Sequence, residues 1–455
     1  MSIAVSSDLS VRHAYEADSS GLHLVPDVVA RPETINDVIE LVKKAAADRM
    51  PVTSAGAQTS TTGASITDKG MLLSLRALDE IKDLDVKSRT VRVGPGAIVG
   101  DIKKHAAAAG LLFAPDPTSE EESTIGGAIA CNASGARTFK YGATRRHIRA
   151  LKVVMASGEL IEFRRSDIEK NTVGYAFAHD PIDWFVGSEG TLGIVVEAEL
   201  ALLSLPARVV GLATLFRGES EALKFVVASR EAASVTPRCI EYFDEQALEI
   251  ARRSGPGTVI PQNARAMVYV EEEINDDFEA SLARWLELIE SIAPDFEPLV
   301  FDGEVRLREA RRIRHSIPSM MNERGGRHRD AGGRKVGTDW AVPYRKLEQA
   351  IQTARLLAQD QELEAPVIYG HAGNGHPHQN FIARDAEELA TIEEVVERTL
   401  RHVLALGGTV AAEHGIGKIK RRWLPLQMNP FQISMMTAVK RDLDPLGILA
   451  PGNIL

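Results

Sequence analysis

Cysteine is scarce in this sequence. Its 455 residues include two cysteines, Cys131 and Cys239. Two thiols so far apart exclude a disulfide framework. Iron–sulfur clusters usually need four thiolates, so this chain cannot hold such a cluster alone. We therefore expect a reducing, cytoplasmic compartment.

Long apolar runs and an excess of cations are also missing. No stretch approaches the roughly 18–20 apolar residues of a membrane span. Residues 1–18 lack a basic region followed by an apolar run, so we expect no secretory signal. The formal net charge is −10, which argues against nucleic acid as the main partner. A small anionic substrate stays compatible with this charge, because it needs only a few local cations.

The usual nucleotide-binding fingerprints are absent too. Neither Gly-x-Gly-x-x-Gly after a strand nor a phosphate-binding P-loop occurs. Five clusters of small residues instead crowd the N-terminal half: Ser54–Ser60, Asp116–Ser119, Thr124–Gly127, Asn132–Gly135 and Gly187–Gly193. Glycines allow the backbone to approach a ligand closely, and successive N–H groups form anion-binding nests. Each cluster alone is typical of a turn, but together they favour a bound ligand of unnamed kind.

Hydrophobic periodicity changes near Pro206. Before it, the pattern predicts strands at 71–75, 90–93, 150–155, 159–163 and 193–203 and helices at 36–48 and 98–109. After it, the pattern predicts strands at 209–216, 266–271 and 367–369 and helices at 219–233, 278–292, 303–324, 344–359, 386–406 and 430–442. The length indicates two or more domains. The second pattern predicts an α+β domain in which helices cover one face of a sheet.

Histidines gather in the C-terminal half. His371, His376 and His378 lie in one glycine-rich segment, and Glu413-His414 follows later. Two histidines and a carboxylate leave coordination positions open, as in catalytic metal sites. A further histidine suits proton transfer, because its unperturbed pKa is about 6.5. The pattern alone fits hydrogen-bonded surface histidines equally well.

The ordered motifs resemble a known family. Arg31–Thr34, the five clusters and Tyr141–Thr144 occur in the order of FAD-linked oxidases of the vanillyl-alcohol-oxidase type. The C-terminal half resembles the branch of D-lactate dehydrogenase, D-2-hydroxyglutarate dehydrogenase and the glycolate oxidase flavin subunit. The resemblance implies an α+β fold with a two-subdomain FAD-binding domain of the PCMH type at 1–205. An α+β substrate (cap) domain with an antiparallel sheet would follow at 206–428, and a C-terminal segment, 429–455, would return to the FAD domain.

The resemblance also implies which residues bind FAD. They are Ser54, Ala55, Gly56, Ala57, Gln58, Thr59, Ser60, Pro117, Thr118, Gly126, Gly127, Asn132, Ser134, Gly135, Tyr141, Gly142, Thr144, Glu189, Gly193 and Ile194. In the family the pyrophosphate loop usually begins Arg-Gly-x-Gly-Thr, but here it begins Ser-Ala-Gly-Ala. The loop also lacks the histidine with which several relatives bind flavin covalently. We therefore expect non-covalent FAD.

The same resemblance implies catalytic and metal-binding roles for residues of the C-terminal half. It implies that His371, His378 and Glu413 are ligands of a divalent metal such as zinc, and that His414 is the catalytic base. His376 replaces an asparagine of the family pattern, so it is either an extra ligand or a substitute for that amide.

Three residues are expected to bind the substrate. Asn380 belongs to the histidine motif, while Arg314 and Lys335 match the family's carboxylate-binding cations. Arg311 and Arg312 are expected to face solvent. Pro318 stands where some members have threonine, which leaves the exact acid open, 2-hydroxyglutarate especially.

The implied activity is FAD-dependent oxidation of a small D-2-hydroxy acid, such as lactate, glycolate or 2-hydroxyglutarate, to the 2-oxo acid. Electrons would pass to an external acceptor: a quinone, a cytochrome, an electron-transfer flavoprotein or an iron–sulfur subunit. A homodimer is the expected assembly. Three alternatives stay open. The chain could be a flavin subunit active only with an iron–sulfur partner, an oxygen-using alcohol or sugar oxidase, or a metal-binding regulatory protein.

Overall fold

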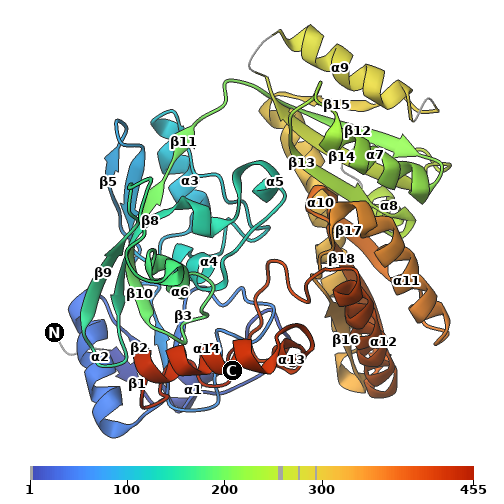
Figure 1. The fold of residues 1–455 in the computed structure, drawn as a ribbon. Coiled ribbons are helices and arrows are strands. Elements are labelled where there is room, and N and C mark those ends of the chain that lie inside the picture. The colour runs from blue at the N-terminus through green and yellow to red at the C-terminus, as the bar shows by residue number, and fades with distance from the viewer. Residues whose placement is uncertain (1–3, 255–259, 275–276, 293–294) are drawn as a thin grey trace. The chain divides into compact units, whose positions relative to one another are not determined.

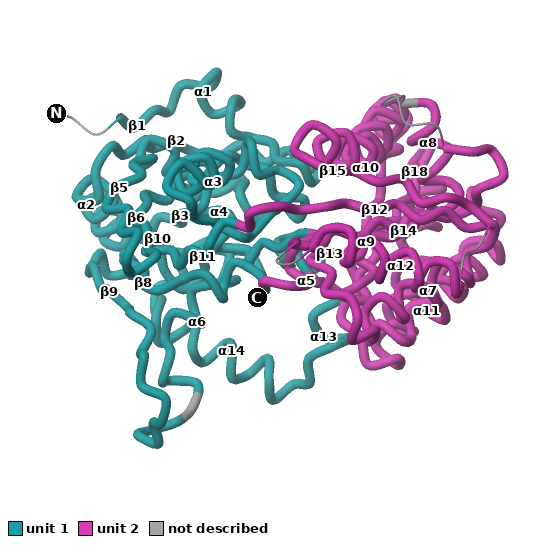
Figure 2. The backbone as a smooth tube through the Cα atoms, turned by 90° about the horizontal axis from the view of Figure 1, so that it is seen from above, with its two compact units in different colours: residues 1–135, 142–205, 413–455 teal, residues 136–141, 206–412 magenta. Residues whose placement is uncertain are grey.

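The computed structural model describes residues 4–254, 260–274, 277–292 and 295–455. The chain divides into two compact units, coloured separately in Figure 2. Unit 1 comprises Met1–Gly135, Gly142–Leu205 and Glu413–Leu455, and unit 2 comprises Ala136–Tyr141 and Pro206–Ala412. The chain thus returns to unit 1 at Glu413, earlier than the expected position 429. Glu189 of unit 1 accepts hydrogen bonds from the backbone N–H groups of Ile416 and Gly417, and these long-range contacts hold the segment in unit 1.

The first part of unit 1 is a four-stranded mixed sheet with the order β1-β2-β4-β3 (Figure 1). Its elements are β1 (Ala4–Ser6), β2 (Val28–Arg31), β3 (Val52–Ala55), β4 (Met71–Ser74), α1 (Leu9–His13) and α2 (Ile35–Asp48). Helix α2 begins with a capping box between Thr34 and Asp37. Its apolar residues recur every three or four positions and pack against β4, as expected for an amphipathic helix.

The second part of unit 1 is a five-stranded antiparallel sheet with the order β5-β6-β10-β8-β9, beside a two-stranded ribbon of β11 and β7. The strands are β5 (Ile81–Asp85), β6 (Thr90–Val93), β7 (Leu111–Leu112), β8 (Ile148–Val154), β9 (Leu160–Arg164), β10 (Ile194–Ala201) and β11 (Leu203–Ser204). The helices are α3 (Val99–Ala108), α4 (Ile125–Cys131), α6 (Ile182–Phe185), α13 (Leu424–Gln427) and α14 (Pro430–Leu443), with 3₁₀ turns at Thr144–His147, Ala176–Ala178 and Arg421–Trp423. The two sheets form two α+β subdomains, as expected.

Unit 2 contains a seven-stranded antiparallel sheet with the order β15-β12-β14-β13-β17-β18-β16. The strands are β12 (Val209–Phe216), β13 (Pro237–Phe243), β14 (Ala266–Glu273), β15 (Leu299–Asp302), β16 (Gly332–Gly337), β17 (Val367–His371) and β18 (His376–Asp385). The helices are α5 (Thr138–Tyr141), α7 (Glu219–Glu231), α8 (Glu245–Ser254), α9 (Phe278–Glu290), α10 (Gly303–Gly326), α11 (Leu347–Gln359) and α12 (Ala386–Ala405), with 3₁₀ turns at Arg329–Ala331, Tyr344–Lys346 and Ala372–Asn374.

Helices cover both faces of this sheet, which corrects the expectation of one covered face. On one face, Phe243 and Tyr369 pack in a core with Ile313 and Ile317 of α10. On the other face, the hydroxyl of Tyr242 donates to Glu219 of α7. Successive side chains of a strand point to opposite faces. Strand β13 is therefore buried along its whole length.

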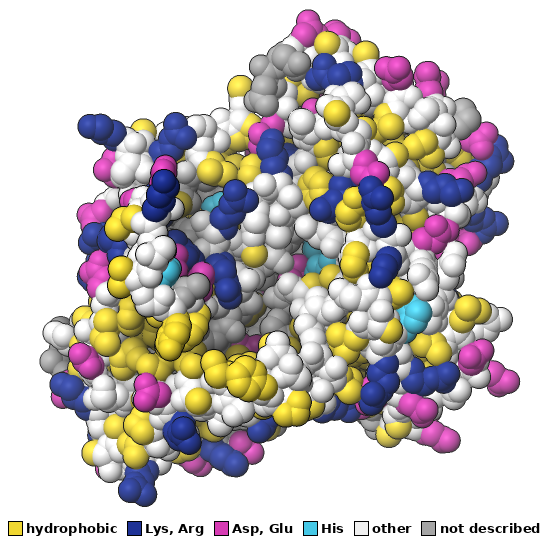
Figure 3. Space-filling model, in the orientation of Figure 1, with side chains coloured by type: hydrophobic (Ala, Val, Ile, Leu, Met, Phe, Trp, Pro, Cys, Tyr) yellow, Lys and Arg dark blue, Asp and Glu magenta, His cyan; other side chains and the backbone are white. Residues whose placement is uncertain are grey.

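The described helices include none that is long and apolar enough to cross a membrane. On the face drawn in Figure 3, basic and acidic side chains are interspersed, and no single basic surface dominates. This mixed surface agrees with the net charge of −10.

Helix α10 approaches β16 so closely that one position accommodates only glycine. A Cβ atom on Gly325 would lie 2.5 Å from the backbone nitrogen of Lys335, whereas a Cβ on Gly326 would meet nothing within 4 Å. We predict that Gly325→Ala lowers the free energy of unfolding by about 1–3 kcal/mol through overpacking. Gly326→Ala, the matched control, should leave it unchanged or raise it by up to about 1 kcal/mol. Chemical denaturation followed by circular dichroism measures both, and equal stabilities would contradict this close approach.

Candidate functional site

The glycine-rich clusters of unit 1 meet one another. A Cβ atom on Gly56 would lie 2.0 Å from Oγ1 of Thr124, and one on Gly135 would lie 2.1 Å from the carbonyl oxygen of Asp116. Four clusters, far apart in sequence, are thus paired at distances that only glycine permits. The sequence predicted a common ligand for these loops, and their convergence fits that prediction.

The fifth cluster, Gly187–Gly193, joins the same region through its backbone. Gly187 and Glu189 donate N–H bonds to the carbonyl oxygens of Ile129 (2.9 Å) and Ala130 (2.8 Å) in α4. Glu189 adopts a left-handed backbone conformation, with φ of 52°. Burial raises the pKa of Glu189, although backbone N–H groups of Gly417 and Ile416 stabilise its carboxylate. Its side chain therefore anchors the segment that follows Glu413.

The expected FAD-binding residues lie in both units. Asn132 and Thr144 belong to unit 1, where Thr144 donates from Oγ1 to the carbonyl oxygen of Ala133 at 2.7 Å. Tyr141 belongs to unit 2, where the guanidinium carbon of Arg238 lies 5.6 Å from the centre of its ring. The side-chain amide of Gln58 donates hydrogen bonds to the backbone oxygens of Tyr15 and Ser65. No pattern in the sequence indicated these two hydrogen bonds.

His371, His376 and His378 lie on a β-hairpin whose two strands are joined by the short glycine-containing turn Ala372–Asn374. Strand β17 ends at His371, and β18 begins at His376. In the antiparallel register, His371 faces His376 and Tyr369 faces His378. Directly opposed residues share one face of a sheet, and so do residues two apart on a strand. All three imidazoles therefore lie on the face that α10 covers.

The imidazoles are buried and close together. The His371 ring centre lies 5.2 Å from those of His376 and His378, and the latter two are 4.8 Å apart. Asn380 is buried two residues beyond His378 and donates from its amide to the His378 carbonyl oxygen at 3.2 Å. The hairpin register thus brings together four of the residues that the sequence singled out.

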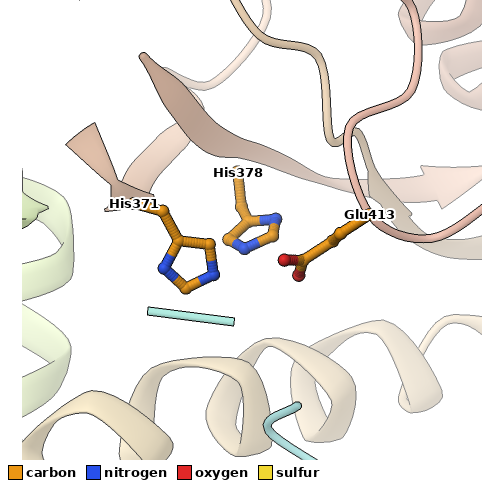
Figure 4. Close-up of side chains that lie close together, drawn as sticks. All are labelled: His371, His378 and Glu413. Carbon is orange, nitrogen blue, oxygen red and sulfur yellow. The ribbon is translucent and has the colours of Figure 1, made fainter. Parts of the chain in front are cut away.

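His371, His378 and Glu413 form a group that could hold a metal ion (Figure 4). One candidate ligand atom from each lies within 4.8 Å of the others. Glu413 directly follows Ala412, whose N–H donates to the backbone oxygen of Asp339 at 2.8 Å. Within unit 1, Glu413 accepts from Oγ of Ser134 at 3.2 Å, and Nε2 of His414 lies 3.4 Å from its Oε1. Two nitrogens and a carboxylate are a donor set that suits zinc and similar divalent ions.

Glu241 of β13 connects the histidines to the expected carboxylate-binding arginine. Its Oε1 lies 2.6 Å from Nδ1 of His371, and its Oε2 accepts from Nε of Arg314 at 3.1 Å. Burial raises the pKa of Glu241, but His371 and Arg314 lower it by more, so its pKa lies below the ordinary value. The guanidinium carbon of Arg314 also lies 4.7 Å from the centre of the Tyr369 ring.

Lys335 lies on the same face of the sheet, on β16. A Cβ atom on Gly337 would lie 3.6 Å from Cε of Lys335 and 3.1 Å from Oδ1 of Asn380, so the lysine extends across the glycine. Its Nζ donates to Oδ1 of Asn322 in α10 at 3.0 Å. Burial, and then the charge of Arg314, lower the pKa of Lys335 to about 8. The charge of Arg314 is therefore close enough to Lys335 to lower its pKa.

Sequence reasoning did not find Glu241. It lies in the strand Pro237–Phe243, among Cys239, Ile240, Tyr242 and Phe243. A carboxylate inside a mostly apolar strand could have indicated such a residue, because buried carboxylates are rare unless they are paired. Arg311 and Arg312, which were expected to face solvent, are exposed.

Comparisons with known proteins agree with this architecture. Residues 26–164 match the FAD binding domain, and residues 205–454 match the C-terminal domain of FAD linked oxidases. Glycolate oxidase subunit GlcD of Bacillus subtilis (strain 168) is 29% identical, covering 94% of this chain and 89% of that protein. D-lactate dehydrogenase of Archaeoglobus fulgidus is 29% identical, covering 94% and 91%. D-2-hydroxyglutarate dehydrogenase of Xanthomonas citri pv. viticola is 28% identical, covering 94% and 89%.

A solved structure shares the fold. Alkyldihydroxyacetonephosphate synthase matches with a TM-score of 0.72 at 17% identity, covering 98% of this chain and 83% of that chain. The C-terminal family model alone spans more than half of the chain. The converging loops of unit 1, the antiparallel sheet of unit 2 and both family matches lead to one conclusion. The chain belongs to the FAD linked oxidases, and it is an FAD-binding oxidoreductase.

Proposed function

We propose that this protein oxidises a small D-2-hydroxy acid to the corresponding 2-oxo acid and passes the electrons to an external acceptor. The observation that carries the proposal is the single face of unit 2 on which buried histidines and two cations lie. Arg314 and Lys335 suit a carboxylate, and His371 and His378 belong to a group that could hold a metal ion. The names of the relatives support the D configuration, since two of them are D-2-hydroxy-acid dehydrogenases.

The chain's own residues would divide the work as follows. Arg314 and Lys335 hold the substrate carboxylate, with Asn380 beside them. His414 accepts the proton of the C2 hydroxyl, while the C2 hydrogen leaves with its electron pair and a C=O bond forms. Bound FAD supplies the acceptor for that hydride. A divalent metal such as zinc, held by His371, His378 and Glu413, would lower the pKa of the hydroxyl.

Anaerobic mixing with a panel of D- and L-2-hydroxy acids tests the proposal. We predict that at least one D acid bleaches the flavin absorbance in the isolated chain, because substrate oxidation reduces FAD without any acceptor present. The matching L acid should bleach it far more slowly. The proposal is wrong if no 2-hydroxy acid reduces the flavin.

One rival function has an observation in its favour, because the Bacillus subtilis relative is named as a subunit. A flavin subunit that works only with an iron–sulfur partner would show no bleaching alone and would recover it with that partner. The same anaerobic panel therefore separates the two functions.

The role of His414 has its own test. We predict that His414→Asn slows flavin reduction by about 10²- to 10⁴-fold, the usual contribution of a general base. FAD should stay bound at the wild-type ratio, and denaturation should release it from both proteins, since we propose a non-covalent cofactor. Near-normal reduction in the variant would refute the role, and flavin that stays on the unfolded chain would refute non-covalent binding.

The lowered pKa of Lys335 predicts that kcat/KM depends on pH. This pKa of about 8 means that the charge that attracts the carboxylate is present below pH 8 and is lost as the pH rises through that value. The ratio kcat/KM should therefore fall above about pH 8. Lys335→Arg keeps its charge, because arginine does not deprotonate in proteins, and should remove this alkaline limb. An identical limb in both proteins would assign it to another group.

A further inference from the structure

We propose that Glu241 is a positioning residue that fixes the metal ligand His371 and the carboxylate-binding Arg314 at one separation. This inference rests on the function proposed above, and it assigns a role to a residue outside the expected site. Its basis is geometry within unit 2: one buried carboxylate contacts both groups, one through each oxygen.

The first contact selects the tautomer of His371. When Nδ1 carries the proton and donates it to Oε1 of Glu241 at 2.6 Å, Nε2 keeps the lone pair that a metal requires. A carboxylate behind a metal-binding histidine also holds the ring in place and makes it a stronger donor. Glu241 thus prepares His371 as a ligand.

The second contact orients Arg314. Its Nε donates to Oε2 of Glu241 at 3.1 Å, and its guanidinium lies over the ring of Tyr369. These two contacts restrain the plane of the guanidinium. The two terminal nitrogens of a guanidinium held through Nε have the geometry that suits a planar carboxylate.

The substrate chemistry explains why the two contacts belong to one residue. In a 2-hydroxy acid, the carboxylate and the hydroxyl are on adjacent carbons, so their anchors must keep a fixed spacing. A misplacement of about 1 Å can cost about 100-fold in rate. Because Glu241 lies in the centre of the sheet on β13, it holds both anchors to a rigid strand.

The substitution Glu241→Gln separates this positioning role from a role in packing alone. The new amide oxygen can accept from only one of the two partners, while the NH₂ group faces the other as a donor. If the oxygen stays on Arg314, the NH₂ group favours the proton on Nε2 of His371, where it blocks metal binding. If the oxygen turns to His371, two donors meet at Arg314. Either arrangement impairs one anchor, although the shape is almost unchanged.

The experiment compares wild type, Glu241→Gln, Glu241→Asp and the control Glu272→Gln. Glu272 is equally buried in the adjacent strand, but it faces the opposite side of the sheet and accepts from Trp285. Chelator-treated holoprotein is titrated with ZnCl₂ by calorimetry, and KM and kcat are measured with the best 2-hydroxy acid. FAD content and thermal midpoint report folding.

For Glu241→Gln, we expect a Zn²⁺ dissociation constant raised about 10- to 100-fold, a raised KM, or both, with FAD content unchanged. Glu241→Asp, which keeps the charge, should recover part of the loss. Glu272→Gln should match wild type in both values.

Two negative results have different meanings. A folded Glu241→Gln protein with wild-type Zn²⁺ affinity and KM overturns the role of Glu241 and leaves the proposed function intact. A wild-type protein that neither binds Zn²⁺ nor is reduced by any 2-hydroxy acid rejects the proposed function, and the role of Glu241 with it.

Discussion

The antiparallel register of β13, β17, β18 and β16 is the constraint on which the candidate site depends. Pairing of Tyr369 with His378 and of His371 with His376 places the imidazoles on one face, and pairing of Gly337 with Asn380 adds Lys335 to that face. A shift of one residue would turn every one of these side chains to the opposite face. Helix α10 then covers the correct face and supplies Arg314. The site is thus a property of strand pairing, with Glu241 as its central ion-pair partner.

Much of the fold could be predicted from periodicity, because several elements bury one clear stripe. The helix expected at 36–48 is α2, and the strand expected at 90–93 is β6. Strands β13 and β18 were missed for physical reasons. Buried on both faces, β13 has no alternating pattern, and β18 begins with a His-Pro-His sequence that resembles a loop. The early return of the chain at Glu413 depends on Glu189, a contact between distant segments that no local pattern shows.

The residues of the site could be predicted from the sequence, but the contacts between them could not. Histidines, Arg314 and Lys335 stood out because their types and spacing match a known chemistry, and the hairpin and α10 gather them in unit 2. The link through Glu241 could not be predicted, since it requires the pairing of β13 with β17. Lys335 shows the same limit: its depressed pKa arises from burial and from Arg314, two features of the folded sheet.

In the proposed reaction, a C2 hydride of a 2-hydroxy acid reduces the FAD of this chain. The most direct measurement is the single-turnover rate of flavin reduction with the best substrate, prepared with ¹H or with ²H at C2. We expect slower reduction with the deuterated acid, because the C2–H bond breaks as the flavin is reduced. Equal rate constants in a reaction that does bleach the flavin would contradict the proposed reaction.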